Sequence, residues 1–306
     1  MNPDAYQATN PIINVPLEKK GKYNQSKQIV KESWAILQKD KEIIWFPVLS
    51  MISSLILCLI MAVIFFFTVL QGDVNQIDQL DRLGSGALNG VEYVYLFVYY
   101  LISFFIINFF QTGILIIVDG RVNGKDLNFK DGINGSKENF GKIFIWSFIS
   151  ATVGVILNFL VNHSKIIGKI VGWVLGTAWT ILTYFSLPSL IIGKKSVTNS
   201  FRESADLIRK TWGEALIINL GVGLFFFTMI LGVITLGGIL AVFIPLFPLQ
   251  VLIFIAVALF VLGTIVISSA LSVIFKLALY EYARTGTILE GFSPELVKNA
   301  IQTEKK

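Results

Sequence analysis

The sequence predicts an all-α, polytopic membrane protein with six transmembrane helices, because of its composition, its uncharged runs and its basic loops. Of its 306 residues, 54% are hydrophobic and only 15% are charged, whereas soluble proteins carry about 25% charged residues. Five long runs contain no Asp, Glu, Lys or Arg: 43–70, 93–118, 143–161, 170–193 and 215–275. A helix needs roughly 20 apolar residues to cross the ~30 Å hydrocarbon core. The first four runs therefore each predict one span, and the last predicts two.

The ends of these spans follow from helix-breaking residues. The predicted spans are 44–69, 93–118, 143–161, 170–191, 215–238 and 250–275. The last turn is expected at Gly237-Gly238 and across Ile244–Pro248, because two prolines three residues apart interrupt helical pairing. Pro188 predicts a kink or an end in the fourth span. Since nothing in the chain alternates like a barrel strand, helices are the expected spanning elements.

The basic residues predict that both ends of the chain lie in the cytoplasm, with the protein in a cell (inner) membrane. Lys and Arg near helix ends favour the cytoplasmic side. The predicted inner segments carry 22 of them, and the predicted outer loops carry 3. The expected organisation is a disordered cytoplasmic tail over 1–25, a six-helix membrane domain over 26–290 and a cytoplasmic tail over 291–306.

A short pattern recurs ahead of the first, third and fifth spans. It reads apolar, basic, acidic, small, apolar at Val30–Trp34, Phe129–Ile133 and Phe201–Ala205. The last two copies continue in ungapped register to the start of their spans. The pattern predicts three hairpins, each preceded by a basic amphipathic helix on the inner membrane surface. The alternative is that any loop before a span tends to be basic and amphipathic.

The third copy shows the expected helical face most clearly. Its apolar residues recur at helical spacing: Phe201, Ala205, Ile208 and Trp212. Ser200 followed by Glu203 predicts a capping box at the start of this helix. The residues expected on the membrane-surface helices are Trp34, Phe129, Phe201, Arg202 and Trp212.

Several stretches of the chain resemble a known family. They are Ser33-Trp34 through Lys39-Asp40-Lys41-Glu42 and Phe46-Pro47, Ser150–Gly154, Ala178-Trp179 to Pro188, Thr211–Glu214, and Ala278–Tyr280 to Gly286. The chain resembles, over most of residues 28–290, a family of prokaryotic multi-pass membrane proteins known only as a domain of unknown function. Its six-helix plan also resembles the membrane domain of some glycerophosphodiester phosphodiesterases. The first resemblance implies a fold and a location but no activity.

Uncharged polar residues inside the spans are candidates for lining a polar cavity: Asn108, Gln111, Asn158 and Asn219. Asn108 and Gln111 lie three apart on one face of the second span. Hydrogen bonding between helices is the alternative use of such residues. Charged residues occur only at span ends, which disfavours a proton- or sodium-coupled pump, because such pumps usually need a buried carboxylate.

A stripe of small residues predicts close helix packing in the fourth span. Its members are four residues apart: Gly168, Gly172, Gly176 and Thr180. This spacing lets two helix backbones approach closely. Packing within one chain is the expected use, and a homodimer face is the alternative.

The sequence offers little for chemistry. It has one cysteine, Cys58, and one histidine, His163, so a Cys/His metal cluster and an intramolecular disulfide are excluded. We expect no metal, cofactor or catalytic residue; Asp119 and Arg121 are the only reactive-looking pair. The positive-inside bias explains the net charge of +5 without nucleic acid as a partner.

The function that we expect is therefore a non-enzymatic scaffold or accessory subunit. Its expected partners are anionic lipids of the inner leaflet, a partner protein or a second copy of the chain. The alternative is a transporter or lipid-handling protein for a small solute or a phospholipid.

Overall fold

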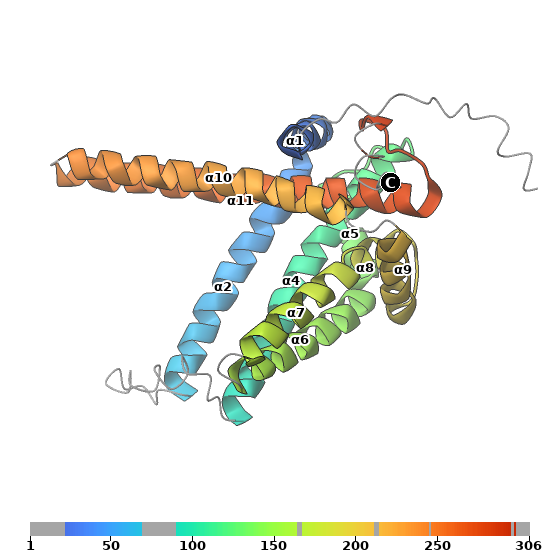
Figure 1. The fold of residues 1–306 in the computed structure, drawn as a ribbon, viewed down its shortest axis with the longest axis horizontal. Coiled ribbons are helices and arrows are strands. Elements are labelled where there is room, and N and C mark those ends of the chain that lie inside the picture. The colour runs from blue at the N-terminus through green and yellow to red at the C-terminus, as the bar shows by residue number, and fades with distance from the viewer. Residues whose placement is uncertain are drawn as a thin grey trace, which may run out of the picture.

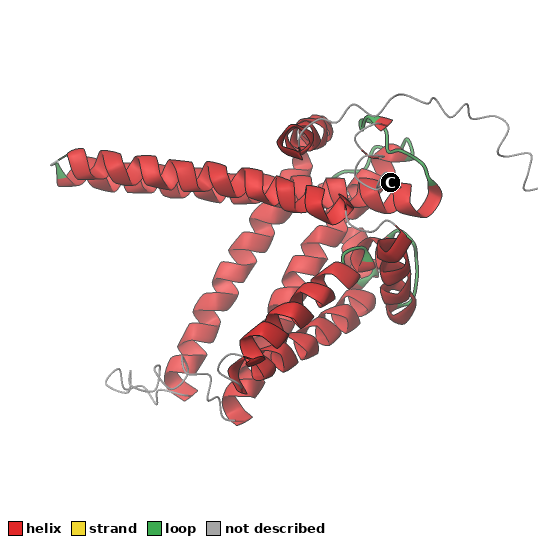
Figure 2. Ribbon diagram, viewed as in Figure 1, coloured by secondary structure: helices red, strands yellow, loops and turns green. Residues whose placement is uncertain are grey.

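The computed structural model describes residues 22–68, 90–163, 167–210, 214–244, 246–294 and 297. All regular structure in these residues is helical (Figure 2). The helices are α1 (Lys22–Lys39), the 3-10 helix η2 (Lys41–Ile44), α2 (Trp45–Thr68), α4 (Gly90–Val122), α5 (Phe129–Glu138), α6 (Phe140–His163), α7 (Ile167–Leu182), α8 (Ser186–Ile191), α9 (Val197–Lys210), α10 (Glu214–Phe243) and α11 (Phe247–Thr285). Six described segments are long and apolar enough to cross a membrane. The predicted all-α fold with six membrane-spanning segments is confirmed.

The fourth span is interrupted at residues 183–185, between α7 and α8. Pro188 has no amide hydrogen, so it cannot bond to the carbonyl one turn earlier, and its ring crowds that turn. The break leaves the Phe185 amide without a helical partner. Ser204 of α9 supplies one, because its Oγ accepts a hydrogen bond from Phe185 N at 2.9 Å. The predicted break therefore also fixes where α9 packs.

The fifth span runs further than the sequence predicts. Helix α10 continues through Gly237 and Gly238 and ends at Phe243, so the turn is confined to residues 244–246. An apolar environment favours a continuous helix, because it leaves no backbone group unpaired. Gln250 helps to close this turn: its Nε2 donates to Ala241 O at 3.0 Å and to Ile244 O at 2.9 Å.

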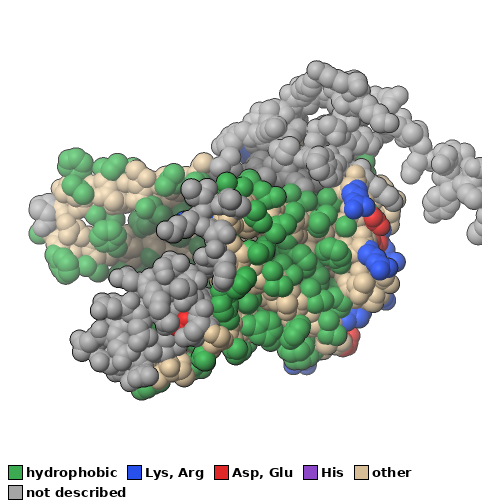
Figure 3. Space-filling view, turned by 60° about the horizontal axis from the view of Figure 1, so that its bottom comes forward, with side chains coloured by type: hydrophobic (Ala, Val, Ile, Leu, Met, Phe, Trp, Pro, Cys, Tyr) green, Lys and Arg blue, Asp and Glu red, His purple; other side chains and the backbone are tan. Residues whose placement is uncertain are grey.

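The helices share a polar end, which we define as α1, η2, α5, α9 and residues 286–297. Helices α2, α4, α6 and α7 run away from this end side by side (Figure 1). In Figure 3, hydrophobic side chains cover the central part of the visible face, and most of the visible charged side chains lie at one edge. Helices α10 and α11 pack along each other and project at a wide angle from the other spans (Figure 1). Most described side chains of this hairpin between residues 225 and 262 are exposed or half-buried, so its outer part is not held by the bundle.

The core lies near the polar end, where α4, α8 and α11 pack against one another. These helices end the second, fourth and sixth spans, and we call them the return helices. The second half of α11 is buried there, from Ala270 to Tyr280 with few exceptions, including the fully buried Tyr280. Each return helix is followed by a residue with a left-handed backbone: Gly124 (φ 71°), Lys194 (φ 51°) and Gly286 (φ 73°). Glycine takes this conformation freely, whereas Lys194 adopts it at a cost in backbone strain.

The three helices that carry the recurring sequence pattern, α1, α5 and α9, lie around this core. Helix α5 packs chiefly on α4, and α9 packs on α8, which is the return helix before it in each case. Helix α1 is the first of the three and packs chiefly on α10 and also on α11. The small residue of each sequence copy is buried: Ser33, Gly132 and Ser204. Equivalent positions of the three copies therefore face the core.

The helix starts differ from the expected capping. Helix α9 begins at Val197, three residues before Ser200, and the Ser200 hydroxyl donates to Val197 O at 2.8 Å. The predicted capping box at Ser200 is therefore wrong. A capping box lies instead at α5, where Asn128 caps the Asp131 amide and Asp131 accepts from the Asn128 amide. This box supports a helix that Gly132 and Gly135 would otherwise weaken.

The ends of the membrane domain lie near one another. Helix α1 begins at Lys22, within the segment expected as a tail, and residues 1–21 lie outside the described residues. Glu32 of α1 accepts a hydrogen bond from Ser293 N at 3.0 Å, and Gln28 Nε2 donates to Ser293 Oγ at 3.1 Å. Phe292 and Val297 are buried, so the start of the expected C-terminal tail packs onto the domain.

Candidate functional site

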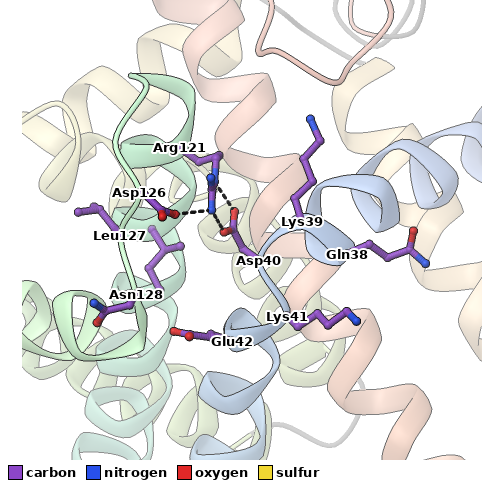
Figure 4. Close-up of a pocket in the computed structure, with 10 residues that line it drawn as sticks. Gln38, Lys39, Asp40, Lys41, Glu42, Arg121, Asp126, Leu127 and Asn128 are labelled. Atoms are coloured by element: carbon purple, nitrogen blue, oxygen red, sulfur yellow. Dashed lines mark hydrogen bonds and ion pairs between the residues drawn. The ribbon is translucent and has the colours of Figure 1, made fainter.

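A cavity of about 420 Å³ lies at the polar end, between the end of α1 with η2 and the end of α4 (Figure 4). Its lining residues are Gln38, Lys39, Asp40, Lys41, Glu42, Ile117, Arg121, Asp126, Leu127 and Asn128. We call it the first cavity. Its volume lies in the range of pockets that hold small ligands or headgroups.

An ion-pair cluster forms one wall of the first cavity. The Asp40 side chain is only 7% exposed, and its carboxylate accepts from Arg121 Nε at 2.8 Å and also from Arg121 Nη2. The same Nη2 donates to Asp126 Oδ1 at 2.9 Å. The planar guanidinium suits this two-pronged contact. The cluster ties the end of α1 to the end of α4 and satisfies the buried carboxylate.

A second wall is built around the start of α5. Glu42 Oε2 accepts from Phe129 N at 2.6 Å, and Asn128 Oδ1 accepts from Lys130 N at 2.9 Å. These bonds satisfy the first amides of α5 from within the chain. The cavity therefore does not present a free helix N-terminus to a ligand.

The remaining charges at the first cavity are two lysines. Figure 4 shows Arg121 between Asp40 and Asp126, with the ammonium groups of Lys39 and Lys41 pointing away from this cluster. Both lysine side chains are exposed. The acidic groups of the cavity already accept hydrogen bonds from Arg121 or from the α5 backbone. The chemistry that this arrangement offers is electrostatic binding of an anion at the rim, beside a rigid polar wall.

The candidate cavity residues from the sequence lie elsewhere. Asn108 donates from Nδ2 to Ser147 Oγ of α6 at 3.2 Å, which is a hydrogen bond between two spans. Gln111 and Asn158 are half-buried in α4 and α6. Asn219 lies in α10, and its side chain is outside the described residues. The structure thus joins Asn108 to a neighbouring helix. None of the four residues lines the first cavity or the neighbouring cavity at the ends of α4, α5 and α8.

The stripe of small residues faces α6 for part of its length. Gly168 and Gly172 are buried, and a methyl group at Gly172 would collide with Val161. A methyl group at Gly176 would lie 3.8 Å from Leu157 Cδ1. Thr180 is exposed and donates to Gly176 O of its own helix at 2.9 Å. Gly172 and Gly176 are therefore used for packing within the chain.

The expected membrane-surface residues divide into two groups. Trp34 is 37% exposed, and Arg202 is exposed. Phe129 and Phe201 contact rings of the spans. The Phe129 ring is tilted against that of Phe46, with 4.8 Å between the ring centroids. The Phe201 ring stacks on that of Trp179 at 5.9 Å. Trp212 lies outside the described residues.

The reactive-looking pair of the sequence is separated by the fold. Arg121 lines the first cavity, whereas Asp119 lines a different one on the other side of Leu127. The partner of Arg121 is Asp40, which the sequence analysis did not select as a site residue. The available signal was the run of four charged residues, 39–42, between a helix and a span.

A buried polar cluster was also missed. Glu203 of α9 accepts from the Ser189 hydroxyl and lies 3.4 Å from Tyr280 Oη. Lys276 Nζ lies 5.2 Å above the Tyr184 ring. Among the described residues, no group of three or more His, Cys, Asp or Glu side chains is placed to hold a metal ion.

Comparisons with known proteins place the chain in a family but assign it no activity. Neither curated proteins nor solved structures gave a match to the chain. The likeness to glycerophosphodiester phosphodiesterases therefore has no support. A model of a family of unknown function, DUF6159, matches residues 90–291, which is well over half of the chain. The protein is therefore a multi-pass membrane protein that belongs to the DUF6159 family of unknown function.

Proposed function

We propose that this protein is a non-enzymatic membrane scaffold that binds anionic phospholipid headgroups at its polar end. The observation that carries the proposal is the first cavity, with Lys39 and Lys41 exposed at its rim. In this proposal the polar end faces the cytoplasm. The count of 22 basic residues on that side against 3 on the other supports this orientation.

The depth of the cavity suits a headgroup. Helix η2 lines it and leads directly into α2, which begins at Trp45. Trp45 is 56% exposed, and exposed tryptophan at the end of a span favours the interface between hydrocarbon and water. A phosphate at the level of Lys41 would therefore lie where phospholipid headgroups lie.

The surface below the cavity suits the acyl chains of the same lipid. Helix α2 exposes a series of large apolar side chains along its length: Ile52, Leu55, Ile56, Leu59, Ile60, Val63, Ile64 and Phe67. A lipid with its phosphate near Lys39 and Lys41 would lay its chains along this helix. The ion pair of Asp40 with Arg121 would keep the rim in place, because it joins α1 to α4.

The experiment compares two double variants of equal charge. Lys39→Gln/Lys41→Gln removes the rim cations, whereas Lys27→Gln/Lys31→Gln removes two exposed lysines of α1 outside the cavity. In this proposal each rim lysine forms a direct ion pair with the phosphate, worth about 1 kcal/mol, and Lys27 and Lys31 form none. The rim variant should therefore bind phosphatidylglycerol roughly thirtyfold more weakly. The measurement is native mass spectrometry of a lipid titration in mild detergent.

The control variant should retain most of the wild-type affinity. Circular dichroism should give the same helix content for all three proteins. An equal loss in both variants would mean that diffuse charge binds the lipid, and unchanged affinity in the rim variant would exclude the cavity. Either result would overturn the proposal.

A further inference from the structure

A second cavity of about 390 Å³ lies beside the first, on the other side of the linker between α4 and α5. Its lining residues are Ile116, Asp119, Gly120, Asn123, Lys125, Leu127, Gly135, Glu138, Asn139, Ile191, Ile192 and Lys194. They come from the ends of α4, α5 and α8 and from the α4–α5 linker. Leu127 lines both cavities, so they are direct neighbours.

The two cavities hold equivalent positions in successive copies of the repeat. Ser33 of α1 corresponds to Gly132 of α5, and seven residues further on Asp40 corresponds to Asn139. Asp40 lines the first cavity, and Asn139 lines the second. The ends of α4 and α8 also contribute, because Arg121 at the end of α4 lines the first cavity and Ile191 at the end of α8 lines the second.

The charges of the second cavity differ from those of the first. Asp40 is replaced by the neutral Asn139, and Arg121, three residues before Gly124, is replaced by Ile191, three residues before Lys194. The second cavity therefore lacks that ion pair. It combines two exposed lysines, Lys125 and Lys194, with two carboxylates, Asp119 and Glu138.

This combination matches a ligand that carries both signs of charge. A phosphate is attracted to the lysines, and a primary ammonium donates hydrogen bonds to carboxylates. A quaternary ammonium has no hydrogen to donate. Lys194, which lines the cavity, has a strained backbone (φ 51°), and such strain is often found at functional positions.

We propose that the second cavity binds a phosphoethanolamine group, with Lys125 and Lys194 on the phosphate and Asp119 and Glu138 on the ammonium. The group belongs either to phosphatidylethanolamine or to a soluble glycerophosphoethanolamine. The inference deepens the proposed function and rests on it in one respect, the placement of the polar end at headgroup level. The chain then carries two headgroup sites of different charge preference, one in each of the first two repeats.

The test is a titration of the full chain in mild detergent, followed by native mass spectrometry. Wild-type protein should bind phosphatidylethanolamine about tenfold more tightly than phosphatidylcholine, because only the former donates to the carboxylates. Lys125→Gln/Lys194→Gln should weaken binding of both lipids. Asp119→Asn/Glu138→Gln should abolish the preference between them. Lys130→Gln/Lys137→Gln, two exposed lysines outside both cavities, is the matched control and should change nothing.

The test distinguishes a lipid from a soluble ligand, and it tests the second cavity separately from the first. Competition by glycerophosphoethanolamine at equal concentration identifies a soluble ligand, and failure to compete identifies the lipid. Lys39→Gln/Lys41→Gln should weaken phosphatidylglycerol binding and leave the ethanolamine preference intact. The proposal for the first cavity can therefore be wrong while the proposal for the second cavity holds. Equal binding of the two zwitterionic lipids by the wild type, or a preference that survives Asp119→Asn/Glu138→Gln, would overturn the inference.

Discussion

Replacing Gly132 with leucine should lower the free energy of unfolding by about 3 kcal/mol. A Cβ atom at this position would lie 2.6 Å from Phe46 Cζ, 3.0 Å from Gly113 O and 3.1 Å from Ile117 Cδ1. The backbone oxygen cannot move without displacing α4, so α5 must shift instead. Gly141→Leu is the matched control, because nothing lies within 4 Å of a Cβ atom there. Reversible unfolding in mixed micelles measures both variants.

The same contact gives a double-mutant cycle. Phe46 is fully buried, so Phe46→Ala alone should cost about 3–5 kcal/mol through the cavity that it leaves. In the double variant Phe46→Ala/Gly132→Leu, the leucine side chain enters that cavity. The double variant should be at least about 1 kcal/mol more stable than the sum of the single effects predicts. Strict additivity would show that Gly132 and Phe46 are not in contact.

Reversing the charge of Asp40 should abolish most of the folded yield. Asp40→Arg buries a second guanidinium beside Arg121, and a buried charge without its partner is strongly destabilising. Arg121→Asp places three carboxylates together, because Asp126 also pairs with the Arg121 guanidinium in the wild type. The swapped variant Asp40→Arg/Arg121→Asp restores opposite charges across the main contact, so it should recover a large part of the yield.

Size-exclusion chromatography after detergent extraction measures these yields. Gln38→Arg is the control, because it introduces the same guanidinium group at an exposed neighbouring position. It should fold like the wild type. A swap that is no better than either single variant would mean that the pair does not join α1 to α4.

The spans could be predicted from the sequence because hydrophobic length is a local property. A run of apolar residues identifies a membrane helix without knowledge of its neighbours. The ends of the helices were less accessible. Gly237 and Gly238 are strong breakers in water, yet α10 passes through both, because in an apolar environment an unpaired backbone group costs more than a glycine does.

The site was less predictable because its residues meet only in the fold. Asp40 and Arg121 are 81 residues apart, and each has an ordinary position at the end of a helix. Arg121 was paired with Asp119 in the sequence only because the two are close along the chain. In the structure their side chains line different cavities. The short pattern in the sequence gives another relation: it places Asp40 and Asn139 at corresponding positions, and these residues line the first and the second cavity.

The most direct test of headgroup binding is a cryo-EM structure of the protein in a nanodisc that contains phosphatidylglycerol and phosphatidylethanolamine. A bound antibody fragment provides the necessary size. We expect phosphate density within about 4 Å of the Lys39 or Lys41 ammonium, the distance of an ion pair, with acyl chains continuing along α2. Ordered lipid along α2 with only water in the first cavity would contradict the account.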